Sequence, residues 1–220
     1  MVNIGCWNTW GLNAPKKHLS AKSWIRTQNL AIAGFLETRI AHQNLSNIES
    51  NLNPSSWEFL SNCNPLSSCR ILLGWDPHQF SLTCINSSDQ WITCKACNLV
   101  DNTQYILTFV YGLNTPGGRQ LLWDYIKQPD LHLNQAWVLM GDFNAILKPD
   151  DRVGGDNSWA GHMDDFCNAI THAGLLQPPY TGMKKPHADS PSQASENKSL
   201  SQAIPHPSYQ QHLRPRDIGS

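Results

Sequence analysis

Four short apolar segments of this chain each run directly into polar side chains, and this pattern limits the folds open to it. The segments are 2–6, 31–36, 105–111 and 136–140. Runs of this length predict buried strands, and ligand sites in layered α/β proteins gather at the carboxyl ends of strands. We therefore expect one polar site where the four strand ends meet. Its side chains would be Asn8, Glu37, Tyr111, Asn114, Asp142 and Asn144.

The rest of the chain alternates between strand-like and helix-like segments. Residues 92–100 and 105–111 flank Asp-Asn-Thr and predict a hairpin. Hairpin strands mixed with helices indicate an α/β (α+β) layered sandwich. The last helix would bury a stripe made of Met163, Phe166, Cys167 and Ile170. Further strands are expected at 57–60, 70–75 and 80–85, and helices at 15–28, 44–52, 119–127 and 162–173.

Composition divides the chain after residue 182. All 9 tryptophans and all 7 cysteines lie in residues 1–182. Residues 183–220 contain 7 serines and 5 prolines, and no Trp, Phe, Cys or Val. A segment with so little apolar surface cannot offset the entropy lost on ordering. We therefore predict one domain in residues 1–182 and a disordered Pro/Ser-rich tail in residues 183–220.

The charges of the chain nearly cancel, since 16 basic residues stand against 17 acidic ones. This balance excludes polybasic proteins that bind nucleic acid through bulk charge, but not an enzyme that binds phosphate locally. The sequence has no apolar run long enough for a transmembrane helix and no signal-peptide core at its start. We expect an intracellular protein that neither crosses a membrane nor is secreted, with its cysteines as reduced thiols.

The side chains at the strand ends favour a hard divalent cation. Two carboxylates, three carboxamides and one phenol suit Mg²⁺ or Mn²⁺, and no His or Cys joins them to favour zinc. Asp142 and Asn144 stand two residues apart, so both would point the same way from an extended chain. One can accept a proton from water while the other donates to a phosphate oxygen. Phosphodiester hydrolysis needs this division of roles.

Four short motifs follow one another along residues 1–182. They are Trp7-Asn8 with Gly11-Leu12-Asn13, Leu36-Glu37-Thr38-Arg39, Val110-Tyr111 with Asn114, and Gly141-Asp142-Phe143-Asn144. In this order they resemble the endonuclease/exonuclease/phosphatase superfamily, which has the deoxyribonuclease-I-like fold. Within it they look like the endonuclease domains of plant non-LTR (LINE-type) retrotransposons, which accompany a reverse transcriptase. The resemblance implies two mixed β-sheets packed face to face with outer helices, a Mg²⁺ (or Mn²⁺) cofactor and DNA as the substrate.

The resemblance also implies residues that hold the metal and the phosphate. Glu37 would be the principal metal ligand, and Asn8 would help to hold the metal or the phosphate. Tyr111 and Asn114 would contact the scissile phosphate. Each also has a plain structural interpretation: Glu37 as a solvated carboxylate at a strand end, Tyr111 as the last residue of a core face, and Asn114 as a turn former.

The resemblance also implies roles in catalysis for Asp142 and Asn144. Asp142 would orient or deprotonate the attacking water, and Asn144 would donate to the phosphate oxygen. Two features depart from the family pattern: Trp10 stands where many relatives have an acidic metal ligand, and the 220 residues contain no closing Ser-Asp-His motif. We therefore expect a C-terminally truncated domain with an incomplete second sheet, and weak or absent catalysis.

Three functions follow as hypotheses. The first is Mg²⁺-dependent nicking of DNA by a retrotransposon-type endonuclease, for which the resemblance alone implies nuclear localisation. The second keeps the fold and the metal but acts as a phosphatase on a phosphomonoester or an inositol lipid. The third is a non-catalytic remnant that binds metal, nucleic acid or protein. Turnover on plasmid DNA against soluble phosphate esters separates the first two, and nicking that is lost on Asp142→Ala excludes the third.

Overall fold

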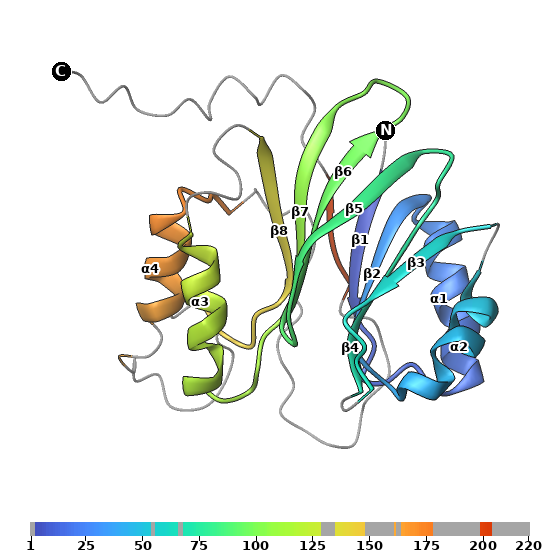
Figure 1. Cartoon of the computed structure of the whole chain (residues 1–220), viewed down its shortest axis with the longest axis horizontal. Coiled ribbons are helices and arrows are strands. Elements are labelled where there is room, and N and C mark those ends of the chain that lie inside the picture. Colours follow the sequence, from blue (N-terminus) through green and yellow to red (C-terminus); the bar gives the residue numbers. More distant parts are fainter. Residues whose placement is uncertain are drawn as a thin grey trace.

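The chain folds into two β-sheets that pack face to face, with a pair of helices outside each sheet (Figure 1). The computed structural model describes residues 3–53, 56–65, 68–128, 135–147, 161, 164–177 and 199–203, the last range by its backbone alone. The predicted layered α/β sandwich with two mixed sheets is confirmed. No helix in these ranges combines the length and the apolar character needed to cross a membrane.

The first sheet has five strands in the order β3-β4-β2-β1-β9. Strand β1 pairs in parallel with β2, whereas β4 pairs antiparallel with both β2 and β3. A parallel pair needs a crossover connection, and helix α1 (Pro15–Thr27) supplies it. Pro15 suits the first helical turn because its missing N–H would have no partner there. The strand bounds are β1 Asn3–Asn8, β2 Leu30–Ile40, β3 Glu58–Ser61, β4 Cys69–Trp75 and β9 Ser199–Ala203.

The second sheet has the order β5-β6-β7-β8. Strands β5, β6 and β7 form an antiparallel meander, which confirms the predicted hairpin between the last two. Strand β8 pairs in parallel with β7. The crossover between them contains a short 3₁₀ turn, η2 (Gly117–Arg119), and helix α3 (Gln120–Ile126). The strand bounds are β5 Phe80–Ser87, β6 Trp91–Asn98, β7 Gln104–Tyr111 and β8 Ala136–Asp142.

Helices cover the outer face of each sheet (Figure 1). Helix α1 and helix α2 (Leu45–Leu52, after the 3₁₀ turn η1, His42–Asn44) cover the five-stranded sheet. Helices α3 and α4 (Asp164–His172) cover the four-stranded sheet, where Trp123 stacks on Phe166 with ring centroids 4.8 Å apart. The predicted stripe on α4 is wrong at Cys167, which is exposed, because the helix turns Phe166 and Ala169 inward instead. Met163 lies outside the described residues.

The two sheets meet in a continuous apolar core. Gly34 on β2 allows Phe109 of β7 to approach, because a Cβ atom at Gly34 would lie 2.4 Å from the Phe109 ring. Every second side chain along the end of β7 is turned into this core, namely Leu107, Phe109 and Tyr111. Close packing of this kind fixes the distance between the sheets and hence the spacing of their strand ends.

One expectation about the cysteines needs correction. Cys63 and Cys69 form a disulfide, although the sequence predicted reduced thiols throughout. The antiparallel pairing of β3 and β4 places the two Cα atoms 4.1 Å apart, which their positions in the sequence do not reveal. Strand β9 lies within the predicted tail and pairs with β1. Any segment with free backbone N–H and C=O groups can extend a sheet edge in this way. The other residues of 183–220 lie outside the described residues.

Candidate active site

The sheet topology brings the four polar strand ends to one end of the sandwich. Strands β1 and β2 run in parallel and place Asn8 beside Leu36, the residue before Glu37. Strands β7 and β8 run in parallel and place Tyr111 beside Asp142. The two sheets then bring these pairs face to face, with β1 in contact with β8. The six predicted side chains therefore gather at one place.

Asp142 is held from both sides. Its Oδ2 accepts a 2.8 Å hydrogen bond from Asn8 Nδ2, and its Oδ1 accepts a 3.0 Å bond from the backbone N–H of Asn144. Beneath it, burial raises the pKa of the Cys6 thiol well above its usual range, and the charge of Asp142 adds to this effect. Cys6 is therefore a protonated core residue, and Asp142 is a carboxylate with a fixed orientation.

Asn144 joins the β8 end to the loop that follows β7. Its Nδ2 donates to the carbonyl oxygen of Gly112 at 2.7 Å and to Asn114 Oδ1 at 3.0 Å. Just before it, Gly141 allows β8 to lie close to Val110 of β7, since its φ is +144° and a Cβ atom there would lie 2.0 Å from the Val110 carbonyl oxygen. Only glycine fits such a position. The predicted turn role of Asn114 and its predicted place in the site are thus compatible.

Glu37 lies within a strand and not after one, which corrects the prediction that the strand ends at Leu36. Strand β2 continues to Ile40 through an irregularity in which Glu37 and Arg39 both have φ of +51°. Thr38 between them is buried and donates to the carbonyl oxygen of Cys69 at 2.8 Å. An irregularity of this kind re-aims the neighbouring side chains. Glu37 remains 8% exposed and forms an ion pair with Arg39.

Tyr111 connects Glu37 to the rest of the site. It is only 7% exposed and interacts electrostatically with Glu37. Burial raises the pKa of Tyr111 to about 12, with the charge of Glu37 as the next contribution, while Arg70 opposes the change. The phenol is therefore a hydrogen-bond donor at neutral pH. Tyr111 is thus both a residue of the core between the sheets and a neighbour of Glu37.

Four basic side chains around the site were not predicted from the sequence. Lys17 donates to the backbone oxygens of Thr9 and Trp10, and burial lowers its pKa. Arg119 is buried and donates to the carbonyl oxygens of Leu113 and Asn114 at 2.8 and 3.1 Å, which holds the loop of Asn114 in place. The remaining two are Arg39 and Arg70.

Of these residues, Arg39 alone left a usable signal in the sequence. It stands two residues after Glu37, the spacing that puts two side chains on one face of a strand. Arg70 lies over the Tyr111 ring, with its guanidinium carbon 4.6 Å from the ring centroid. Nothing in the local sequence marks that contact, because β4 and β7 belong to different sheets.

The chemistry of the donor atoms fits a hard divalent cation. Glu37 and Asp142 supply carboxylate oxygens, and Asn8 supplies a carboxamide. Across the part of the chain that the structure describes, no three His, Cys, Asp or Glu side chains are placed to share an ion. Mg²⁺ is commonly held by one or two carboxylates, substrate phosphate and water, so this set is sufficient. A cation at Glu37 would compete with the Arg39 guanidinium.

A model of the endonuclease/exonuclease/phosphatase family matches residues 5–188. The chain belongs to this family. The resemblance inferred from the four motifs is thereby confirmed at the level of the family, while the plant origin and the truncation stay predictions. A comparison with curated proteins gives no match.

Solved structures of several enzymes share the fold. An AP endonuclease from Leishmania major superposes with a TM-score of 0.60 at 14% identity, over 78% of this chain and 66% of that one. The endonuclease domain of TRAS1, a telomere-specific non-LTR retrotransposon, superposes with a TM-score of 0.59 at 11% identity, over 79% of this chain and 72% of that one. A mannosyl-6-phosphatase from Bacteroides thetaiotaomicron superposes with a TM-score of 0.54 at 10% identity, over 76% and 70%. At these identities the likeness concerns the fold.

Proposed function

We propose that this chain is a Mg²⁺-dependent phosphodiesterase that nicks DNA, in the manner of a retrotransposon endonuclease. The observation that carries the proposal is the fixed Asp142 carboxylate, held by Asn8 and Asn144 and facing the Tyr111–Glu37 pair. Phosphodiester hydrolysis needs a group that orients water and donors for the phosphate oxygens. The site has both within one network of hydrogen bonds.

Each side chain then has a role in the reaction. Asp142 orients the attacking water and accepts its proton. Asn144 and Asn114 position the phosphate, and the Tyr111 hydroxyl turns from Glu37 to donate a hydrogen bond to a phosphate oxygen. Glu37 and Asn8 hold the divalent cation, which when bound stabilises negative charge on the phosphate and the leaving oxygen.

The surface beside the site supports DNA as the substrate. Among the tryptophans that the structure describes, Trp10 alone is mostly exposed, at 64%. Its backbone is held by Asn8 and Lys17, and the exposed Arg39 side chain extends from the neighbouring strand. An exposed aromatic ring beside cationic side chains is typical of nucleic-acid contacts, since bases stack on such rings. The retrotransposon domain of the same fold supports the same choice.

The extent of catalysis depends on a motif that the chain does not contain. No Ser-Asp-His occurs in the 220 residues. A positioned acid–base group contributes about 10²–10⁴-fold to a rate. We therefore propose weak nicking by this chain. A phosphatase remains the second candidate, because a mannosyl-6-phosphatase shares the fold.

The test is nicking of supercoiled plasmid in Mg²⁺ by the wild-type chain and by Asp142→Ala, with Asp124→Ala as the control. Asp124 is an exposed residue of α3. We expect slow nicking that Asp142→Ala abolishes and Asp124→Ala leaves unchanged. Hydrolysis of soluble phosphate monoesters without any nicking would favour the phosphatase. A folded chain that is inert on both substrates would overturn the proposal in favour of a non-catalytic remnant.

A further inference from the structure

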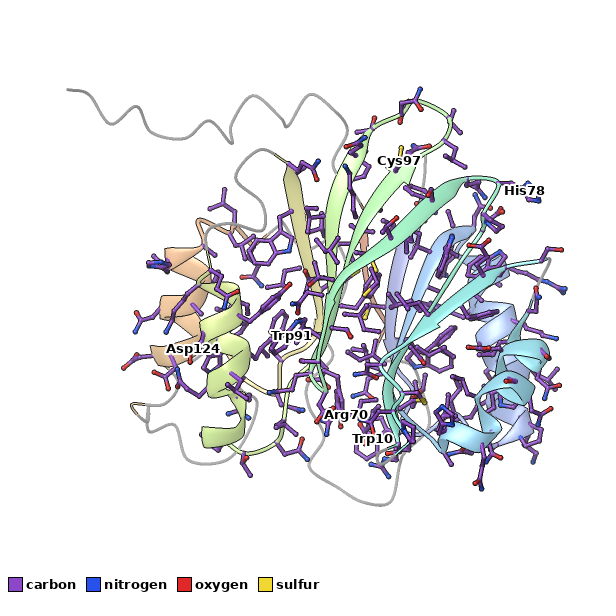
Figure 2. All side chains as sticks on the ribbon, viewed as in Figure 1. Trp10, Arg70, His78, Trp91, Cys97 and Asp124 are labelled. Atoms are coloured by element: carbon purple, nitrogen blue, oxygen red, sulfur yellow. A yellow bond between two sulfur atoms is a disulfide. The ribbon has the colours of Figure 1, made fainter. Side chains whose placement is uncertain are left out.

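Arg70 lies at the same end of the sandwich as Trp10, away from Cys97 and His78 at the other end (Figure 2). Its place is fixed from two directions. Its backbone N–H donates to Asn62 Oδ1 at 3.0 Å, next to the Cys69–Ile40 pairing of β4 and β2. Its guanidinium carbon lies 4.6 Å from the centroid of the Tyr111 ring. The side chain is therefore aimed from the first sheet at a residue of the candidate active site.

The positive charge of Arg70 has no carboxylate partner among the described residues. The ion pairs found there are Arg39–Glu37 and Lys127–Asp124. The Arg70 Nε atom is buried and has no hydrogen-bond partner. A buried donor without a partner is costly, more so in a charged group. The face of the Tyr111 ring offsets part of this cost, because an aromatic face attracts a cation, but it accepts no N–H hydrogen bond in the plane of the guanidinium.

An anion at the active site would supply what Arg70 lacks. The guanidinium presents several N–H groups in a planar fork that matches the oxygens of a phosphate. We propose that Arg70 binds the phosphate group of the substrate, while Tyr111 holds the Arg70 guanidinium in place. This proposal rests on the function proposed above. Tyr111 would then serve both sides of the site, with its hydroxyl toward Glu37 and its ring beneath Arg70.

The experiment compares DNA binding by the wild-type chain, Arg70→Gln, Arg70→Lys and the control Arg26→Gln. Arg26 is an exposed residue in the last turn of α1. Affinity for a fluorescein-labelled duplex is measured by anisotropy in Ca²⁺ over a series of salt concentrations. We expect Arg70→Gln to bind about tenfold more weakly. We also expect the slope of its plot of log K against log salt concentration to be shallower than that of the wild type by about 0.9 units. This is the change for one phosphate contact.

The salt slope distinguishes phosphate binding from a structural role. A merely structural Arg70 would change affinity or melting temperature without changing the number of counterions released. We expect Arg70→Lys to keep the wild-type slope, since it keeps the charge, but to regain only part of the affinity, since it loses the fork. An Arg70→Gln protein that folds and matches the wild type and Arg26→Gln in affinity and slope overturns the proposal. If Arg70→Gln does not fold, the affinity of Arg70→Lys decides. Weaker binding than the wild type supports the proposal, and equal binding overturns it.

A chain that binds no DNA would overturn the proposed substrate and leave Arg70 still testable. In that event the melting temperature is measured in inorganic phosphate. We expect phosphate to raise the melting temperature of the wild type and of Arg26→Gln more than that of Arg70→Gln or Arg70→Lys. Equal shifts in all four proteins, including no shift, overturn the assignment of Arg70.

Discussion

Asn8 Nδ2 donates a 2.8 Å hydrogen bond to Asp142 Oδ2, across 134 residues of sequence and between the two sheets. The bond joins the end of β1 to the end of β8. Because the backbone N–H of Asn144 donates to the other carboxylate oxygen, the Asp142 carboxylate cannot rotate without losing one of its two hydrogen bonds. The orientation of the proposed general base therefore depends on a residue from the opposite sheet.

Changing Asn8 should alter both the rate and the pH dependence of nicking. Asn8→Ala frees the Asp142 carboxylate, and we expect a loss of about 10²-fold from its misplacement. Asn8→Asp places two carboxylates within hydrogen-bond distance, so the pKa of one of them rises. The acidic limb of the pH profile should then move to higher pH. The control is Asn51→Ala on α2. An Asn8→Asp profile with an unmoved acidic limb would contradict this account.

The ion pair between Arg39 and Glu37 should weaken cation binding. Arg39→Gln removes a cation that competes for Glu37, so we expect a lower Kd for Mn²⁺, by about twofold to fivefold for a partly exposed pair. Glu37→Gln should abolish binding. Mn²⁺ titration followed by electron paramagnetic resonance measures both, with Arg26→Gln as the control. An Arg39→Gln protein that binds Mn²⁺ more weakly would mean that Arg39 supports the metal site.

Tyr111 should titrate far above an ordinary tyrosine. Its pKa of about 12 means that the folded chain keeps this proton after the unfolded chain has lost it near pH 10. Between these values the unfolded state binds fewer protons, so the contribution of Tyr111 to stability is present below pH 10 and declines as the pH rises toward 12. Ultraviolet difference titration of the wild type against Tyr111→Phe isolates this phenol. A difference spectrum with its midpoint near pH 10 would show that Tyr111 is not buried against Glu37.

Gly34→Ala should separate the two sheets. The added methyl group would lie 2.4 and 2.6 Å from two atoms of the Phe109 ring, which is fully buried. Overpacking of this kind costs about 1–3 kcal/mol in the free energy of unfolding. Gly117→Ala is the matched control, since nothing lies within 4 Å of its added Cβ atom. Urea unfolding measures both, and equal free energies for the two variants would refute this account of the sheet contact.

The sequence by itself determined where the elements lie and which side chains follow the strands. The spacing of apolar residues and the length of an apolar segment are local properties of the sequence. For this reason α1 begins at Pro15 and β7 ends at Tyr111 as predicted. The four ordered motifs were also sufficient to predict the family, because each motif is a short stretch of residues near one another in the chain.

Tertiary structure alone decided how these pieces meet. The irregularity that turns Glu37 and Arg39, the disulfide between Cys63 and Cys69, and the strand formed by Ser199–Ala203 all depend on pairing between strands. The contact of Arg70 with Tyr111 depends on the packing of one sheet against the other. Local pattern cannot encode such contacts, because strand order, register and sheet packing are set by partners far away in the sequence. The sequence thus named six side chains that the fold brings to one place, and the fold added the arginines that surround them.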